Sequence, residues 1–256
     1  MPLIQAGMAD RIGSIAFDHY AKRNALSAAL IEECLAAFVR FEAEGARAVI
    51  LRSATPQKVW SAGHSVDELP KANQDPLHYD DPLEQLLRAV RGFPAPVIAM
   101  VQGVAWGGAC DLVMACDIVF GDESCGFAIT PAKIGLPYNA QGIVHFLGRL
   151  PLNVVTEMFC TAEPVLAERA LRLGILNELF PAAELEARTL ATARVIATRS
   201  SEAIASFKAI AVALADAAPL SAGTFERLHG LRRKVYFGRD YTEGIAAFLE
   251  KRPARF

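Results

Sequence analysis

The 256-residue sequence has few cysteines, and their spacing argues against the sites that cysteines most often build. The five are Cys34, Cys110, Cys116, Cys125 and Cys160, and no two of them form a C-x-x-C pair. This scatter disfavours a disulfide scaffold, a structural zinc site and a redox dithiol. The five histidines are equally dispersed, without H-E-x-x-H or another helical pair, so the sequence predicts no metal centre.

Net charge and long apolar runs are also lacking. The 26 Lys and Arg residues nearly balance the 28 Asp and Glu residues, so there is no basic footprint for nucleic acid or an anionic membrane. The longest unbroken apolar run, 209–215, is far shorter than the roughly 18 residues of a spanning helix. The first ten residues contain no basic region followed by an apolar stretch, so no secretory signal is predicted. We therefore expect a soluble, cytoplasmic protein.

Motifs for nucleotide binding and nucleophilic catalysis are missing as well. The chain contains neither G-x-x-x-x-G-K-[S/T] nor G-x-G-x-x-G, and it has no G-x-S-x-G nucleophile elbow. In an apolar chain without these motifs, backbone N–H groups become the first candidates for catalytic groups.

What the sequence does have is a high apolar content, with 53% hydrophobic and 21% charged residues. A chain of this length buries about three-quarters of its unfolded surface, as one large domain or as a core with an appendage. Short apolar runs alternate with helical patterns over the first two-thirds, which predicts an α/β fold with largely parallel strands. The expected strands are 12–17, 48–52, 97–101, 117–120 and 125–129. The expected helices are one capped by Ser27, one over 81–90, and one that includes 111–115.

After Pro151 the composition shifts towards Ala, Leu and Glu, without an intervening linker. Helical patterns then dominate, and the expected windows are 152–160, 164–172, 182–198, 201–216, 220–236 and 239–250. A helical segment that follows an α/β core often covers a site or forms an oligomer interface.

Two small-residue turns could supply backbone donors. The first is Ser61-Ala-Gly-His64, shortly after the expected strand 48–52, where a glycine lets the backbone approach a ligand closely. The second is Gly107-Gly108 at the start of an apolar helix, where free N–H groups meet the positive end of the helix dipole. Two such amides aimed at one oxygen would form an oxyanion hole. The simpler alternative for each turn is tight packing of a strand against a helix.

Five stretches, taken in order, resemble the enoyl-CoA hydratase/isomerase (crotonase) superfamily. They are Arg23-Asn-Ala-Leu-Ser27, Ser61-Ala-Gly-His-Ser-Val66, Gly103-Val-Ala-Trp-Gly-Gly-Ala-Cys-Asp111, Ala115-Cys-Asp117 and Phe127-Ala-Ile-Thr-Pro-Ala-Lys-Ile-Gly135. The resemblance continues to Phe248-Leu-Glu-Lys-Arg-Pro253 and so covers nearly the whole chain.

The resemblance implies a crotonase-like spiral of ββα units in residues 1–195 and a helical trimerisation region in residues 196–256. It implies an acyl-CoA substrate and assembly as a homotrimer or homohexamer. We expect no binding of nucleic acid or membrane and no metal. We also expect no cofactor beyond the coenzyme A that is part of the substrate. The amides of His64 and Gly108 are implied to hold the thioester oxygen as enolate charge develops. The residues expected to line the substrate site are Arg23, Ala25, Ala62, His64, Ser65, Val66, Asp67, Glu68, Gly107, Gly108, Thr130, Tyr138 and Lys251.

Departures from the family pattern bear on the reaction. Hydratases of this family activate water with two glutamates, but here the first position holds Asp111, and the second aligns with Pro131 or Ala132. Neither Pro131 nor Ala132 transfers protons, which disfavours hydration. The resemblance within the family is instead to a member that decarboxylates, which implies cofactor-independent decarboxylation of methylmalonyl-CoA or a close malonyl-CoA analogue. This reaction is consistent with the missing glutamates, because the thioester itself accepts the electrons. Tyr138 would then orient the leaving carboxylate by one hydrogen bond.

Alternatives remain open at this point. Another crotonase reaction would take its base from Asp111, Asp67 or Glu68, and a non-catalytic acyl-CoA-binding trimer is a third possibility. The His64 ring either contacts the carboxylate or only accompanies its amide. Lys251 aligns with a basic residue that meets the CoA nucleotide in the family, and the alternative is a solvated charge. The basic run Arg232-Arg-Lys234 is more typical of a solvated helix face than of a phosphate clamp.

Overall fold

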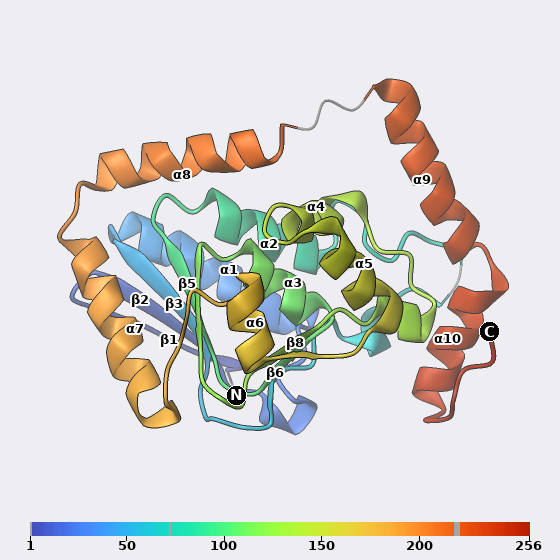
Figure 1. Cartoon of the computed structure of the whole chain (residues 1–256), viewed down its shortest axis with the longest axis horizontal. Helices are drawn as coiled ribbons and strands as arrows, with labels where there is room; N and C mark the ends of the chain where they lie inside the picture. Colours follow the sequence, from blue (N-terminus) through green and yellow to red (C-terminus); the bar gives the residue numbers. More distant parts are fainter. Residues whose placement is uncertain (1, 72, 218–220) are drawn as a thin grey trace.

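The computed structural model describes residues 2–71, 73–217 and 221–256, and two β-sheets form its centre (Figure 1). The larger sheet has six strands in the order β1-β2-β3-β5-β7-β10. The strands are β1 (Ile4–Ala9), β2 (Ile12–Phe17), β3 (Ala48–Ser53), β5 (Val97–Val101), β7 (Ile118–Gly121) and β10 (Glu178–Leu179). Strands β1 and β2 form an antiparallel hairpin, whereas every other pairing in this sheet is parallel.

The central strand β5 is buried at every position, as its unbroken apolar sequence predicts for a parallel strand covered on both faces. On one face, Ile98 and Met100 pack with Leu185 and Ala193 of α7 (Ala182–Ala197). The other face of the sheet packs into the main hydrophobic core, which also contains residues of the core helices described below.

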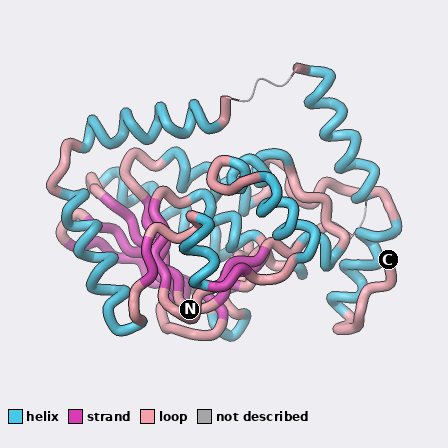
Figure 2. Tube along the Cα trace, viewed as in Figure 1, coloured by secondary structure: helices cyan, strands magenta, loops and turns pink. Residues whose placement is uncertain are grey.

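The smaller sheet has the order β4-β6-β8-β9. Its strands are β4 (Val59–Ser61), β6 (Val104–Trp106), β8 (Gly126–Ala128) and β9 (Val165–Leu166). Strands β4, β6 and β8 each follow a strand of the larger sheet and precede a helix. This repeated strand–strand–helix order confirms the ββα units expected from the resemblance, and Figure 2 shows the strands of the two sheets as two separate magenta groups.

The core helices begin where the sequence provides caps. α1 (Ala28–Ala43) starts after Ser27, whose hydroxyl accepts a hydrogen bond from the Leu30 amide at 3.3 Å. α2 (Pro82–Gly92) starts after Asp81, whose carboxylate accepts from the Leu83 amide at 2.9 Å. The other core helices are α3 (Gly108–Ala115), α4 (Ala140–Leu147), α5 (Leu152–Thr161) and α6 (Ala167–Leu173).

The remaining C-terminal helices are α8 (Ser201–Ala215), α9 (Ala222–Tyr236) and α10 (Arg239–Leu249). α8 runs along the upper edge of the core in Figure 1, and α9 descends on the right to α10. The six expected windows each contain a helix; part of the 220–236 window lies outside the described residues. The 164–172 window is wrong at its start, where the two-residue strand β9 precedes α6, and β10 lies between two windows; both strands are too short to leave a periodic signal. Among the described residues, none of the helices is both long and apolar enough to cross a membrane.

Candidate active site

A cavity of about 1150 Å³ opens at the side where the strand-to-helix turns meet. Its wall comes from η1 (Tyr20–Lys22) and the loop after it, η2 (Val66–Glu68), the start of α3, η3 (Pro131–Ile134) and α10. All thirteen residues that the sequence assigns to the substrate site lie in this wall: Arg23, Ala25, Ala62, His64, Ser65, Val66, Asp67, Glu68, Gly107, Gly108, Thr130, Tyr138 and Lys251.

The two small-residue turns touch each other at the inner end of this cavity. Gly63 has φ +83°, and a Cβ on it would lie 2.3 Å from the Trp106 carbonyl oxygen and 2.9 Å from the Gly108 nitrogen. A Cβ on Gly108 would lie 3.3 Å from the His64 nitrogen. Glycine is therefore required at 63, because a side chain would separate the two turns.

The amides of His64 and Gly108 have no hydrogen-bond acceptor within the part of the chain that the structure describes. The Gly108 amide is at the first position of α3, where no carbonyl one turn earlier is available. The dipole of α3 adds positive potential at the same point. The two amides can thus stabilise an oxygen atom on which negative charge develops.

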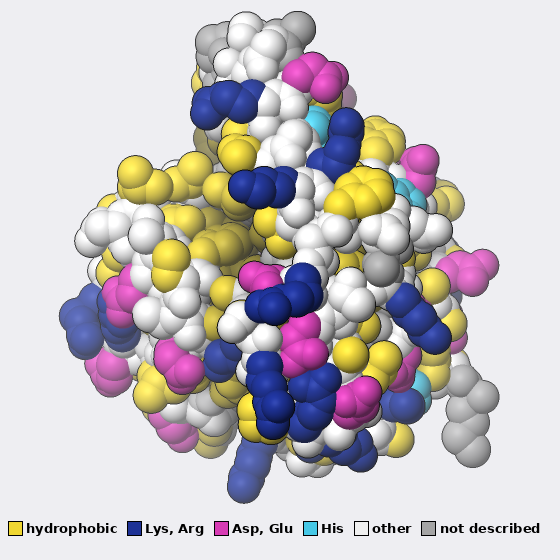
Figure 3. All heavy atoms as spheres, turned by 90° about the vertical axis from the view of Figure 1, so that its right-hand side faces the viewer, with side chains coloured by type: hydrophobic (Ala, Val, Ile, Leu, Met, Phe, Trp, Pro, Cys, Tyr) yellow, Lys and Arg dark blue, Asp and Glu magenta, His cyan; other side chains and the backbone are white. Residues whose placement is uncertain are grey.

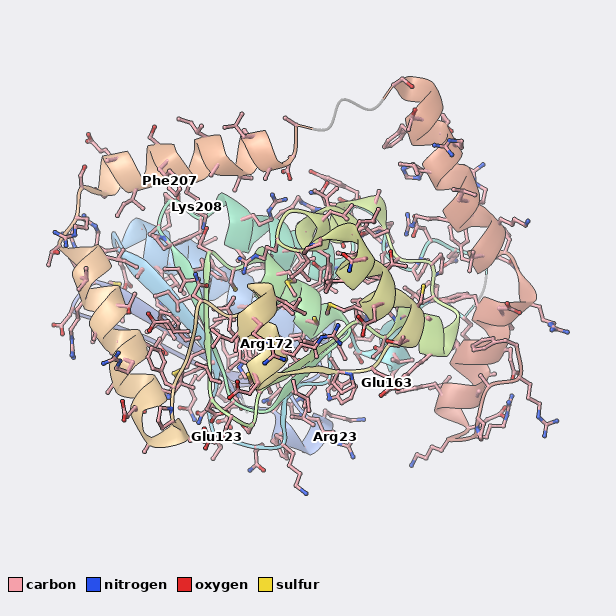
Figure 4. The ribbon with its side chains drawn as sticks, viewed as in Figure 1. Arg23, Glu123, Glu163, Arg172, Phe207 and Lys208 are labelled. Carbon is pink, nitrogen blue, oxygen red and sulfur yellow. The ribbon has the colours of Figure 1, made fainter. Side chains whose placement is uncertain are left out.

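The loop before α1 is fastened to the first of these turns. Arg23 and Asn24 have φ of +53° and +51°, and Asn24 Nδ2 donates to the Trp60 carbonyl at 3.0 Å. The Ala62 amide donates to the Arg23 carbonyl at 2.9 Å, and the Leu26 amide donates to the Gly63 carbonyl at 2.8 Å. Arg23, labelled in Figure 4, is consequently held at the cavity rim by backbone contacts.

The ring of His64 is held between two acceptors. Nδ1 lies 3.1 Å from the Ser65 carbonyl, and Nε2 lies 3.2 Å from Oδ2 of Asp81. Burial by itself lowers the pKa of His64, but the hydrogen bond and the charge of Asp81 outweigh it, so the pKa is raised overall. Both nitrogens therefore engage the protein, and the ring fixes the turn that carries the His64 amide.

Tyr138 lines the same cavity as the two amides and contacts the first turn of α3. Its hydroxyl donates to Oδ2 of Asp111 at 2.6 Å, and Asp111 occupies the first turn of α3. Oδ1 of Asp111 lies 2.7 Å from Nδ1 of His145 on α4. Burial, followed by the charge of Asp111, raises the pKa of Tyr138 well above its usual value, so the phenol keeps its proton. A Cβ on Gly142 would lie 2.3 Å from the Tyr138 ring, so glycine allows α4 to approach this cluster.

A second buried carboxyl group, absent from the sequence-based assignment, lies behind this cluster. Glu84 on α2 is 4% exposed, and its Oε1 accepts from Nδ2 of Asn139 at 2.6 Å. Burial, with a further contribution from the charge of Asp111, raises the pKa of Glu84 to about 7. Asn139 also caps α4 by accepting from the Gly142 amide at 2.6 Å. Asp81, Glu84, Asn139 and His145 were all missed, because only the fold brings them to the site.

The carboxylates in the cavity wall are Asp67 and Glu68, and both are engaged near its rim. Asp67 lies 3.8 Å from Nζ of Lys22, and Glu68 Oε2 accepts from the Ala28 amide at 2.8 Å. Pro131, one of the two residues that the sequence aligns with the second glutamate of a hydratase, lines the cavity. Within the described chain, no group of three or more His, Cys, Asp or Glu side chains is arranged to hold a metal ion.

Helix α10 and the residues after it line the cavity, and contacts of α9 and α10 with the loop before α2 hold this part of the chain in place. The Tyr241 hydroxyl donates to the Pro70 carbonyl at 2.6 Å. Arg232 makes a bidentate contact with Asp75, with one nitrogen 2.8 Å from a carboxylate oxygen, so the expected solvated role of Arg232 is wrong. Lys251, with φ +54°, lines the rim just after α10. Figure 3 shows Lys and Arg side chains interspersed with acidic ones on this side of the molecule.

Residues 7–256 match the family model described as enoyl-CoA hydratase/isomerase. Methylmalonyl-CoA decarboxylase of Escherichia coli (strain K12) is 40% identical over 247 residues, covering 96% of this chain and 95% of that protein. The human mitochondrial enoyl-CoA hydratase domain-containing protein 3 is 32% identical over 247 residues, covering 95% of this chain and 80% of that protein.

Solved structures give the same result for the fold. A crystal structure of methylmalonyl-CoA decarboxylase complexed with 2S-carboxypropyl-CoA superposes with a TM-score of 0.97 at 39% identity. The superposition covers 100% of this chain and 98% of that one. The α/β architecture with ββα units therefore matches the crotonase fold expected from the sequence.

Proposed function

The chain belongs to the enoyl-CoA hydratase/isomerase family, and from this membership we propose that it is a carboxy-lyase that converts methylmalonyl-CoA to propionyl-CoA and CO₂. The likeness to methylmalonyl-CoA decarboxylase over nearly the full length of both proteins supports this proposal. The observation that carries it is the composition of the inner end of the cavity. The cavity is lined by two amides without an acceptor among the described residues, by the Tyr138 phenol and by Pro131, and the position of a hydratase's second glutamate falls on Pro131 or Ala132.

In the proposed reaction, the amides of His64 and Gly108 donate to the thioester oxygen. The bond between C2 and the carboxylate breaks, its electron pair forms the C=C bond of an enolate, and negative charge moves to the thioester oxygen. CO₂ leaves, and C2 then takes a proton to give propionyl-CoA. Losing one such donor typically raises the barrier by about 3–4 kcal/mol, so the two amides would contribute most of the stabilisation of the enolate.

Tyr138 would orient the carboxylate out of the plane of the thioester, so that the breaking bond overlaps with the carbonyl π system. A phenol donates one hydrogen bond without neutralising the carboxylate, which preserves the tendency to lose CO₂. Thr130, Ala62 and Val66 would shape the acyl pocket, while Arg23, Ala25 and Lys251 would meet the CoA portion at the rim. No cofactor is needed in this scheme, because the thioester accepts the electrons.

We further propose that the chain assembles as a homotrimer, or as a dimer of trimers, through residues 196–256. Large apolar side chains of α8 and α9 support this assembly: Phe207 and Leu214 are each 72% exposed, and Leu231 is 57% exposed. Such a stripe on two successive helices is typical of an interface between subunits. We also propose that the protein works in the cytoplasm, as expected from the sequence.

The test is to incubate the protein, with and without a chelator, with methylmalonyl-CoA, malonyl-CoA and crotonyl-CoA, and to follow the products by mass spectrometry. The proposal predicts loss of CO₂ from methylmalonyl-CoA, unaffected by the chelator, and little hydration of crotonyl-CoA. Preferential addition of water to crotonyl-CoA would identify a hydratase instead. Binding of all three thioesters without turnover would identify an acyl-CoA-binding protein.

A further inference from the structure

The Tyr138 hydroxyl faces two acceptors if the proposed substrate binds, but it has only one proton. The proton is donated to Oδ2 of Asp111, at 2.6 Å, and burial keeps the phenol protonated. A phenol has one O–H and two lone pairs. If the bond to Asp111 persists, only lone pairs are directed at the substrate carboxylate, and these repel it.

The other side of Asp111 fixes its charge. Oδ1 accepts from Nδ1 of His145 at 2.7 Å, and both side chains are fully or almost fully buried, at 0% and 6% exposure. Nε2 of His145 is buried without a hydrogen-bond partner among the described residues. A bare ring nitrogen is tolerated far better than an unpaired N–H of an imidazolium, so His145 is neutral with its proton on Nδ1. Asp111 is then an anion that accepts one bond on each oxygen.

Substrate binding would place a second carboxylate on the opposite side of the Tyr138 oxygen. Two anions that share one phenol in a buried site cannot both be stable, as in any close pair of carboxylates. A proton on Oδ2 of Asp111 removes this conflict, because Oδ2 then donates to the phenol oxygen at the same distance. The Tyr138 O–H can then rotate towards the substrate carboxylate without breaking any covalent bond.

We propose that Asp111 and His145 form a proton-dependent switch for Tyr138: Asp111 takes up one proton from solvent when a carboxylate-bearing acyl-CoA binds, which turns the phenol from Asp111 to the ligand. The proposal rests on the proposed function, since that function supplies the carboxylate. Asp111 and His145 are positioning residues in this scheme, whereas Tyr138 contacts the substrate.

Other titratable groups surround Asp111 and must be distinguished from it. Glu84 acts on Asp111 from α2, and Cys110 precedes Asp111 on α3. His64 contacts Asp81, the residue that caps α2. The groups are Asp81, Glu84, Cys110, Tyr138, His145 and His64. Cys110 is fully buried and its thiol pKa is raised well above the usual value by burial, so it stays protonated. Glu84, His64 and the bare Nε2 of His145 are the competing acceptors of a proton, and of these only Glu84 would give the infrared band of a carboxylic acid.

The experiment is calorimetric titration with 2-carboxypropyl-CoA, an inert carboxylate ligand, and with propionyl-CoA, its neutral counterpart. Repeating each titration in buffers of different ionisation enthalpy gives the number of protons bound with the ligand. Both ligands carry the same CoA phosphates, whose titration cancels in the difference. At pH 8 the switch predicts uptake of about one extra proton with 2-carboxypropyl-CoA, and an affinity that weakens by up to about tenfold per pH unit.

Asp111→Asn is the decisive variant, because its amide NH₂ can donate to Tyr138 as the protonated carboxyl group would. The extra proton uptake should disappear, and 2-carboxypropyl-CoA should bind independently of pH and at least as tightly as to the wild type at pH 8. Glu84→Gln is the matched control and should retain the uptake. Uptake that persists in Asp111→Asn, or is absent from the wild type, would overturn the switch.

A second measurement tests the switch without Asp111→Asn, in case that variant does not fold. Infrared difference spectra of the wild type and of Glu84→Gln should both gain the C=O band of a protonated carboxylic acid when 2-carboxypropyl-CoA binds. Absence of this band from either protein would contradict the switch. Decarboxylation without proton uptake would reject the switch and leave the proposed function standing. Proton uptake without decarboxylation of any malonyl-type thioester would reject the proposed function alone.

Discussion

Individual buried side chains decide which charges the inner end of the cavity can hold. Asp111, at 0% exposure, has two hydrogen-bond partners, Tyr138 and His145. Among the described residues, Glu84 has one side-chain donor, Asn139, and the charge of Asp111 acts on it. Burial with so little compensation disfavours the ionised form of Glu84, whose pKa rises to about 7.

This difference predicts a pH-dependent stability that belongs to Glu84. Because its folded-state pKa is raised from 4.5 to about 7, its stabilising contribution is complete below pH 4.5 and is lost as the pH rises through 7. Glu84→Gln keeps the acceptor for Asn139 and removes the titration. Its free energy of unfolding should match the wild type near pH 4.5 and exceed it by about 3 kcal/mol above pH 7.

Urea denaturation at a series of pH values measures this difference. Glu32→Gln, on the exposed side of α1, is the control for removing one carboxylate from the surface. Parallel stability curves for the wild type and Glu84→Gln would show that Glu84 titrates normally in the folded protein.

At the scale of elements, the start of α3 has two roles, and a comparison of two substitutions at Gly108 separates them. Gly108 supplies a free amide, and its lack of a side chain makes room for Leu83, since a Cβ would lie 2.5 Å from Cδ2 of that residue. Proline fits the backbone at the first position of a helix but has no N–H. Alanine demands the same movement of Leu83 and keeps the N–H.

Gly108→Pro should therefore lose far more activity than Gly108→Ala. The expected further loss in kcat is about 100- to 1,000-fold, the effect of removing one oxyanion donor. Steady-state kinetics with methylmalonyl-CoA, together with circular dichroism to confirm folding, compares the two variants. Equal activity in two folded variants would remove Gly108 from the oxyanion hole.

Some strands and turns of the structure were predictable from the sequence, and others were not. Strands such as β2 and β5 were predictable from their apolar runs, and the turns at Gly63 and Gly107-Gly108 from residue type alone. The three-residue strands β4 and β6 were not, because so few residues show no periodicity; β8 is as short and was predictable only from the longer apolar run 125–129 around it. The bond between Asn139 and Glu84 joins residues 55 positions apart, and that between Arg232 and Asp75 spans 157 positions. Such contacts depend on the tertiary arrangement, for which one sequence offers no local signal.

For the molecule as a whole, α8 contributes both an anchor and an exposed apolar face. Lys208 is buried and lies 2.7 Å from Asp117, which fastens the helix to the core. Its neighbour Phe207, on the same helix in Figure 4, is 72% exposed. A rigidly held helix that presents apolar side chains to solvent is suited to contact another subunit.

Phe207→Glu should therefore weaken the proposed assembly by placing a charge in its interface. Sedimentation velocity should give a trimer or hexamer for the wild type and a smaller species for the variant at the same concentration. Val39→Glu, at a site on α1 that is 70% exposed, is the control and should leave the mass unchanged. A wild-type protein that sediments as a monomer would contradict the assigned role of residues 196–256.

The most direct test of decarboxylation is the effect of Tyr138→Phe on kcat/KM for methylmalonyl-CoA. The variant loses one hydrogen bond to a charged group, a contribution of about 1.5–3 kcal/mol, so kcat/KM should fall by roughly one to two orders of magnitude. Binding of propionyl-CoA, which has no carboxylate, should change little. The account is contradicted if Tyr138→Phe spares decarboxylation, above all if Asp111→Asn at the same time abolishes hydration of an enoyl-CoA.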